Sequence, residues 1–139
     1  MFKLKRPKLR LTIGGLLILT ALIALGLYWT LPAITRITDV KVGTGPAVKK
    51  GDTVTVHYVG KLRDGTEFDS SKKGGQPIDF PVGQGMLIRG MDTGIVGMRP
   101  GGVRRLEIPA SQAYGEKGIP GTIPPNATLG FEVELIGIR

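Results

Sequence analysis

Cysteine is absent from this sequence of 139 residues, and histidine occurs only once. The lack of cysteine excludes disulfides, thiol catalysis and cysteine-ligated metals. One histidine, His57, supplies neither a histidine-rich metal site nor a Ser-His-Asp triad that rests on another histidine. By alternation His57 falls on the polar face of its strand, so we expect a solvated residue without a chemical role.

Phosphate-binding loops and paired acid–base groups are also missing. The glycine clusters at residues 83–85 and 101–102 lack the strand, helix and lysine spacing of a phosphate-binding loop. Asp69 and Asp92 show no spacing that pairs them for acid–base catalysis. The sequence therefore predicts no metal and no cofactor.

Acidic residues are missing from the start of the chain. Residues 1–10 carry five lysines and arginines and no acidic residue. Residues 11–31 follow without any charge, and as a helix this run is about 31 Å long, enough to cross a bilayer core. Because positive flanks stay in the cytoplasm, we expect a signal-anchor helix with the N-terminus inside. The remaining chain is then extracytoplasmic, on the periplasmic or lumenal side.

A cleaved signal peptide is the alternative for this segment. Signal peptides have an apolar region of about 7–15 residues, followed by small residues at the cleavage site. Here the apolar run is longer and ends on the bulky Tyr28 and Trp29, whose rings suit the membrane interface. The run therefore favours an uncleaved anchor, and under either interpretation the remainder is exported.

The remainder divides into a short linker, residues 32–38, and one small domain, residues 39–139. The formal net charge of +8 is misleading, because five of the positive charges belong to the N-terminal flank. The rest of the chain has 14 basic and 11 acidic residues, which are interspersed rather than clustered. This distribution does not predict binding to nucleic acid.

Alternating apolar and polar residues indicate β-strands through most of the domain. The clearest strand covers residues 53–59, where Val54, Val56 and Tyr58 share one face. The pair Asp64-Gly65 then indicates a hairpin. Further strands are expected at residues 39–42, 66–69, 77–82, 103–108 and 128–138.

Residues 86–97 are the only part of the domain with the spacing of an amphipathic helix. Leu87, Ile88, Met91 and Ile95 fall on one helical face. Gly97 is suited to end such a helix. A lone helix among strands is expected to be covered by the sheet, so the pattern predicts an α+β domain with this helix as the floor of any pocket.

The connection at residues 109–127 is long for a compact domain, and such loops are commonly functional or disordered. Tyr114, Ile119 and Ile123 are apolar groups that favour burial, so we expect an ordered loop. A tyrosine among glycines and prolines suits a pocket wall better than a core. Asp69 leaves its strand beside apolar residues, and its carboxylate needs a donor there, which a tyrosine hydroxyl can supply.

Five short motifs then occur at defined spacing. They are residues 56–58 (VHY), 64–71 (DGTEFDSS), 87–90 (LIRG), 113–115 (AYG) and 123–129 (IPPNATL), and residues 131–135 (FEVEL) follow near the end. In order and spacing they resemble the FK506-binding family of peptidyl-prolyl cis–trans isomerases, over residues 37–139. The resemblance implies an antiparallel sheet of five to six strands wrapped around one short helix, which fits the pattern above.

Carried over by position, the resemblance implies an apolar pocket over the helix. The Ile88 backbone N–H and the Tyr114 hydroxyl are expected to bond substrate carbonyls. Asp69 is expected at the pocket edge, bonded to Tyr58, and Phe68 completes the set assigned to catalysis. The remaining substrate-binding positions are Phe80, Leu87, Met91 (the floor), Ile123 (the flap) and Phe131.

Three positions depart from the family pattern. Met91 stands where the family usually has tryptophan, Ile119 where it often has an aromatic residue or histidine, and Ile78 where an aromatic residue is common. Methionine is thinner and more flexible than an indole ring. We therefore expect a deeper and less rigid pocket, with only weak binding of FK506-like macrolides and less effect on catalysis.

The resemblance implies a membrane-anchored isomerase that turns X–Pro bonds in exported or membrane-associated polypeptides, without covalent or metal catalysis. A non-catalytic proline-recognising module of the same fold is the alternative, and Met91 is the feature that favours it. A holdase chaperone is a third interpretation. It usually needs an inserted apolar flap domain in this family, and residues 70–80 and 109–127 are too short for one.

Overall fold

The computed structural model describes residues 33–139. The predicted basic flank and transmembrane helix, residues 1–10 and 11–31, lie outside this range. Among the described residues, no helix is both long enough and apolar enough to span a membrane. The architecture that follows is that of the domain alone.

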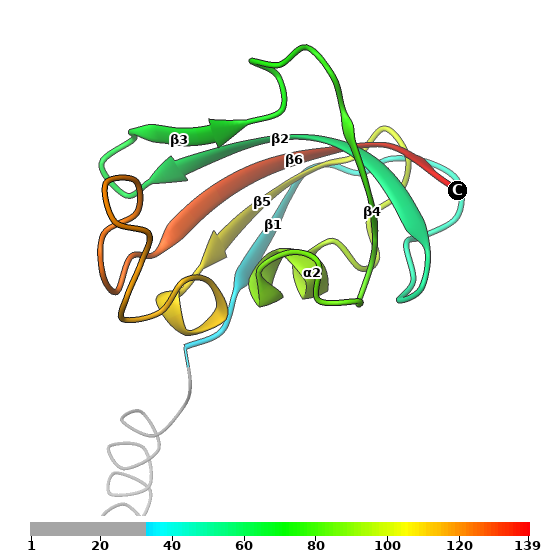
Figure 1. Ribbon diagram of the computed structural model, residues 1–139. Coiled ribbons are helices and arrows are strands. Elements are labelled where there is room, and N and C mark those ends of the chain that lie inside the picture. The colour runs from blue at the N-terminus through cyan, green and yellow to red at the C-terminus, as the bar shows by residue number, and fades with distance from the viewer. Residues whose placement is uncertain (1–32) are drawn as a thin grey trace, which may run out of the picture. The chain divides into compact units, whose positions relative to one another are not determined.

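Six strands in residues 33–139 form an antiparallel sheet, and a short helix lies against one of its faces (Figure 1). The elements are β1 (Arg36–Lys41), β2 (Thr53–Leu62), β3 (Glu67–Ser70), β4 (Ile78–Pro81), α2 (Arg89–Gly94), β5 (Val103–Ile108), the 3-10 turn η1 (Ala110–Gln112) and β6 (Leu129–Ile138). The strand order is β1-β5-β6-β2-β3, and β4 pairs with the first half of β2. The predicted antiparallel sheet around one short helix is confirmed.

Alternation along the long strands builds the core. β5 and β6 pair without a register shift from Val103 opposite Glu134 to Ile108 opposite Leu129, so their inward residues stay in phase. Each fully buried aliphatic side chain contributes about 1.5–3 kcal/mol relative to an exposed one. The core contains Val48, Val54, Val56, Phe80, Val82, Met91, Ile95, Met98, Leu106, Ile108, Ile123, Leu129, Phe131, Val133 and Leu135.

Helix α2 is shorter than the predicted helix of residues 86–97. Ile88 directly precedes it and has φ −55° and ψ 144°, which is an extended conformation. The helix ends at Gly94, and Gly97 has a φ of +87°, which prevents continuation. The prediction was wrong at its start because Leu87 and Ile88 are half-buried through an extended segment, which imitates the spacing of a helical face.

Two glycines let α2 pack closely on β5. A Cβ on Gly90 would lie 2.3 Å from Cγ2 of Ile108, and one on Gly94 would lie 2.8 Å from Cδ2 of Leu106. The buried Arg104 guanidinium then donates to the Gly94 carbonyl at 2.8 Å, which satisfies a group at the helix C-terminus. The helix is therefore fixed in depth and position below the sheet.

Strand β1 begins at Arg36, so residues 36–38 belong to the sheet rather than to the predicted linker of residues 32–38. Arg36 lies opposite Glu107 and Thr38 opposite Arg105 on β5. Every residue of β1 is exposed, because the strand forms an edge of the sheet. An edge strand carries a weak apolar pattern, which is why its start was missed.

Candidate active site

A hollow of about 380 Å³ opens between α2 and the strands that curve over it. Its walls come from β2, β3, β4, β6, the segment that leads into α2, and the loop after β5. Among the lining residues only Asp69 carries a charge. The lining residues are Val56, Tyr58, Phe68, Asp69, Ile78, Phe80, Met86, Leu87, Ile88, Met91, Tyr114 and Phe131. Nine of the ten predicted site residues are thus brought together.

Three aromatic rings form one wall of this hollow. The Phe68 and Phe131 rings meet edge to face, with centroids 5.6 Å apart and an interplanar angle of 88°. Tyr58 lies at 6.3 Å from Phe131 in a tilted arrangement. Gly60 makes room for this cluster, because a Cβ there would lie 2.8 Å from both the Phe68 and Phe131 rings. The wall therefore depends on a missing side chain in the middle of β2.

A single hydrogen bond crosses the edge of the hollow between Tyr58 and Asp69. The Tyr58 hydroxyl donates to Oδ2 of Asp69 at 2.7 Å. Burial, followed by this hydrogen bond and the charge of Asp69, raises the pKa of Tyr58 to about 12. The phenol therefore stays protonated at neutral pH, and Asp69 acts as an acceptor for it. This bond was expected from the sequence.

Two hydrogen-bond donors belong to residues that line the hollow and have no acceptor among residues 33–139. No residue between 33 and 139 accepts a hydrogen bond from the Ile88 N–H, whereas the Ile88 carbonyl accepts from the N–H groups of Met91 and Asp92. Tyr114 is 40 % exposed and lines the hollow, which is the placement expected of a pocket wall rather than of a core residue. The hydrogen bonds formed within residues 33–139 leave its hydroxyl free. Both donors are available to carbonyl groups of a bound molecule.

Met91 closes the bottom of the hollow and is 5 % exposed. The next residue, Asp92, is buried and accepts hydrogen bonds from the N–H groups of Gly83 at 2.6 Å and Gly85 at 3.1 Å. This carboxylate ties the loop before residues 86–88 to the helix that carries the floor. No sequence pattern indicates this role, because the partners of the carboxylate are backbone groups of a loop.

Ile123 does not line the hollow. It is 3 % exposed and belongs to the core, where its backbone pairs with Ile119 through two hydrogen bonds of 2.8 Å. This short pairing closes a turn that directs Ile123 inward and leaves Ile119 36 % exposed. The predicted flap position is therefore a core position.

Three lining residues were not assigned to the site from the sequence. Val56 is two residues before Tyr58 on β2, so the alternation that placed both on one face could have found it. Ile78 begins β4, and its match to a commonly aromatic family position was already a signal. Met86 is 68 % exposed at the mouth, and nothing in the sequence separates it from a solvent-exposed loop residue.

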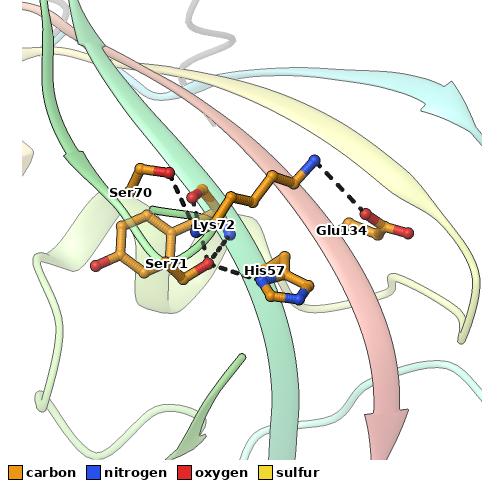
Figure 2. A network of polar contacts seen from close by, with 6 residues as sticks. His57, Ser70, Ser71, Lys72 and Glu134 are labelled. Atoms are coloured by element: carbon orange, nitrogen blue, oxygen red, sulfur yellow. Dashed lines mark hydrogen bonds and ion pairs between the residues drawn. The ribbon is translucent and has the colours of Figure 1, made fainter. Parts of the chain in front are cut away.

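His57 is not simply solvated, contrary to the prediction. It is half-buried on the outer side of β2, and its Nδ1 lies 3.0 Å from Oγ of Ser71 (Figure 2). Ser71 is 7 % exposed and its Oγ accepts from the Tyr58 N–H at 2.9 Å. Lys72 extends from the same turn to Glu134 at 3.8 Å. The network fastens the turn after β3 to β2 and β6, behind the aromatic wall.

The hollow offers apolar contact and hydrogen-bond donors, with no candidate nucleophile. In residues 33–139, no group of three or more histidine, aspartate or glutamate side chains is placed to hold a metal ion. Asp69 is occupied by Tyr58, and the Tyr58 phenol holds its proton at neutral pH. Such a site can desolvate a molecule and orient its carbonyl groups.

Comparison with known proteins decides the family. The profile of the FKBP-type peptidyl-prolyl cis–trans isomerases matches residues 45–136, which include β2 to β5, most of β6 and nearly the whole described domain. The chain belongs to this isomerase family. The FKBP domain found here therefore accounts for the motifs and the hollow together.

Several relatives share this domain. FK506-binding protein 4 of Gibberella zeae is 54 % identical over 101 residues, which are 73 % of this chain and 20 % of that protein. FK506-binding protein 1 of Debaryomyces hansenii is 46 % identical over 109 residues, 78 % of this chain and 97 % of that protein. The chain thus spans about a fifth of the FK506-binding protein 4 relatives and nearly all of the smaller one.

A solved structure has the same fold. The crystal structure of AtFKBP13 superposes with a TM-score of 0.71 at 40 % sequence identity, covering 76 % of this chain and 93 % of that one. The FKBP domain is therefore shared in architecture as well as in sequence.

Proposed function

We propose that the FKBP domain of this chain catalyses cis–trans isomerisation of X–Pro peptide bonds in polypeptides. The observation that carries the proposal is an apolar hollow in which the Ile88 N–H and the Tyr114 hydroxyl are free to bond carbonyl groups. The family assignment supports the reaction, and the hollow supports a substrate that buries a proline ring.

Rotation of an X–Pro bond needs no nucleophile and no proton transfer. The barrier of about 18–20 kcal/mol arises because resonance in the planar amide is lost at the perpendicular geometry. The twisted amide has less charge separation than the planar one, so an apolar hollow disfavours the ground state more than the transition state. Fixed donors can hold the flanking carbonyls during the rotation. Each 1.36 kcal/mol gained in this way is about a tenfold increase in rate.

Tyr114→Phe tests the donor directly. Tyr114 is exposed enough that the loss of one hydroxyl should not unfold the domain, and one hydrogen bond is worth about 0.5–1.5 kcal/mol. We expect kcat/KM for an X–Pro peptide to fall by about three- to tenfold in the full-length protein. Glu116→Gln, in the same loop, is the control and should keep the rate. Equal rates in Tyr114→Phe and Glu116→Gln would contradict a role for the hydroxyl.

We propose further that the domain is anchored to a membrane and acts outside the cytoplasm. The support is the sequence of residues 1–31, five positive charges followed by 21 uncharged residues. Protease added to intact spheroplasts should then digest residues 33–139. Digestion only after lysis would place the domain on the cytoplasmic side. The mass of the mature chain distinguishes an uncleaved anchor from a cleaved signal peptide.

A proline-recognising module without catalysis is the second candidate, and Met91 favours it. This flexible side chain forms the floor of the hollow, where the family usually has tryptophan. The second candidate requires peptide binding without acceleration, and Met91→Trp should then create or strengthen the activity. Under the first candidate, Met91→Trp should mainly tighten the weak binding that we propose for FK506-like macrolides.

A further inference from the structure

Thr35 is half-buried, although it belongs to the predicted linker of residues 32–38. Its hydroxyl donates to Oε1 of Gln112 in η1 at 2.5 Å, across 77 residues of sequence. The same oxygen also lies close to α2, because a Cβ on Gly90 would be only 2.6 Å from it. The Thr35 hydroxyl therefore lies between the helix below the hollow and the turn that leads to Tyr114.

The turn η1 determines where Tyr114 lies. The residues on either side of Tyr114, Ala113 and Gly115, both donate their N–H groups to the Ala110 carbonyl, at 3.0 and 2.8 Å. Tyr114 is thus carried by a closed turn, and Gln112 is the last residue of η1. Among the hydrogen bonds formed within residues 33–139, the Gln112 contact is the only one in which an η1 side chain bonds a distant part of the chain. The position of this turn therefore depends on that contact.

Thr35 is itself held in place by β1, which begins at the next residue. In this strand Asp39 accepts a hydrogen bond from Nε of the buried Arg104 at 2.6 Å. The same guanidinium donates to the carbonyls of Gly94 and Val96, at and just after the end of α2. Arg104 thus fixes β1 to α2, and Thr35 offers η1 a partner in a defined position.

We propose that Thr35 is a positioning residue for isomerisation, which holds η1 through Gln112 and so keeps the Tyr114 hydroxyl at the hollow. This inference rests on the proposed function, in which that hydroxyl bonds a substrate carbonyl. A misplacement of about 1 Å at a reacting site can cost about a hundredfold in rate, so a small displacement of one donor is measurable. Thr35 precedes residues 45–136, so this contribution comes from outside the matched family profile.

The test is a double-mutant cycle of Thr35→Val with Tyr114→Phe in the full-length protein, and the readout is kcat/KM for an X–Pro peptide. Thr35→Val nearly keeps the size of the side chain and removes the hydroxyl. It should lower kcat/KM by about two- to fivefold, because one hydrogen bond that places the donor is lost. In a chain that already carries Tyr114→Phe it should cause no further loss, because the hydroxyl that it positions is gone. Thr35→Ser, which keeps the donor, should keep the rate of the unaltered protein.

Thr38→Val is the matched control, because it makes the same substitution at an exposed threonine of β1, opposite Arg105. It should leave kcat/KM unchanged, whereas Gln112→Leu, which removes the acceptor, should match Thr35→Val. If Thr35→Val leaves kcat/KM unchanged, lowers it equally with and without the Tyr114 hydroxyl, or is matched by Thr38→Val, the inference is overturned while the isomerase function stands.

Failure of the proposed function is a separate outcome. If the unaltered protein accelerates no X–Pro peptide, amide hydrogen exchange at Gly115 is measured instead, because this N–H closes the turn that carries Tyr114. Exchange that becomes severalfold faster in Thr35→Val than in Thr38→Val, relative to the core amides of β6, would still support the role of Thr35 in holding the turn. Equal exchange in the two variants would overturn it.

Discussion

At the scale of single residues, the properties of the hollow depend on which polar groups of the lining already have a hydrogen-bond partner and which do not. Tyr58 shows this most clearly, since its ring contributes to the aromatic wall while its hydroxyl bonds Asp69 at the edge. Its backbone N–H donates to Ser71 on the outer side of the sheet. One residue therefore connects the hollow to the network shown in Figure 2. By contrast, the Ile88 N–H and the Tyr114 hydroxyl, which also belong to lining residues, have no acceptor among residues 33–139.

The ionisation of Tyr58 is a direct prediction at this scale. NMR titration of tyrosine-labelled protein should show one phenol ionising near pH 12, because burial and Asp69 both favour the protonated form. The folded chain therefore binds the Tyr58 proton more tightly than the unfolded chain does. The contribution of this proton to the free energy of unfolding is fully present below pH 10 and is lost as the pH rises toward 12.

Asp69→Asn removes the charge but leaves the burial, which is the larger cause of the raised pKa. We expect the Tyr58 pKa to fall while staying above its ordinary value of 10.0. The variant Tyr58→Phe assigns the NMR signal of the Tyr58 phenol, because that signal disappears from its spectrum. An unchanged titration in Asp69→Asn would contradict the contact between the two side chains.

Gly60 gives a second residue-scale prediction. A Cβ at this position would lie 2.8 Å from both Phe68 and Phe131, so Gly60→Ala must displace two rings of the wall. Overpacking of this kind costs about 1–3 kcal/mol of unfolding free energy, and isomerase activity should fall with it. Gly137→Ala on β6 is the control, because a Cβ there meets nothing within 4 Å. Equal denaturant midpoints for the two variants would refute the predicted crowding.

At the scale of elements, α2 and the loop before it behave as one unit. The helix has only six residues, too few to be stable by itself, so its position depends on its neighbours. Gly90 and Gly94 seat it against β5, and Arg104 bonds its C-terminal end. Asp92 then ties its first turn back to the loop. Floor and wall of the hollow are therefore positioned together.

Removal of the Asp92 carboxylate should release the loop at residues 83–88 from helix α2. Asp92→Ala leaves the Gly83 and Gly85 N–H groups without their acceptor, and such a loss costs about 1–3 kcal/mol. We expect a lower free energy of unfolding and a raised KM, because the segment with the Ile88 N–H loses its anchor. Thr93→Ala, on the exposed side of the same helix, is the control. Equal KM values in both variants would show that the tie does not position the site.

At the scale of the whole molecule, the sequence predicted the strands whose two faces differ. Alternation in β2, β5 and β6 is strong because one face of each is buried in the core. The start of β1 could not be predicted, because all of its residues are exposed. The start of α2 was misplaced because burial of an extended segment gives the same spacing as a helical face.

Prediction of the site residues succeeded and failed for similar reasons. Motif positions brought the aromatic wall and Asp69 together correctly, whereas Ile123 turned inward through local backbone pairing that no motif encodes. Asp92 and Met86 were missed for a related reason. The role of each depends on the shape of the loop at residues 83–88, which the side-chain pattern does not determine.

We propose that the apolar hollow and its free donors speed the rotation of an X–Pro bond without any proton transfer. The most direct measurement is NMR exchange spectroscopy of an X–Pro peptide with the full-length protein, in H₂O and in D₂O. We predict exchange far faster than the spontaneous time of about tens to hundreds of seconds, with nearly equal rates in the two solvents. Exchange of a bound peptide at its spontaneous rate would rule out catalysis by the hollow, and a rate severalfold slower in D₂O would show that a proton is transferred.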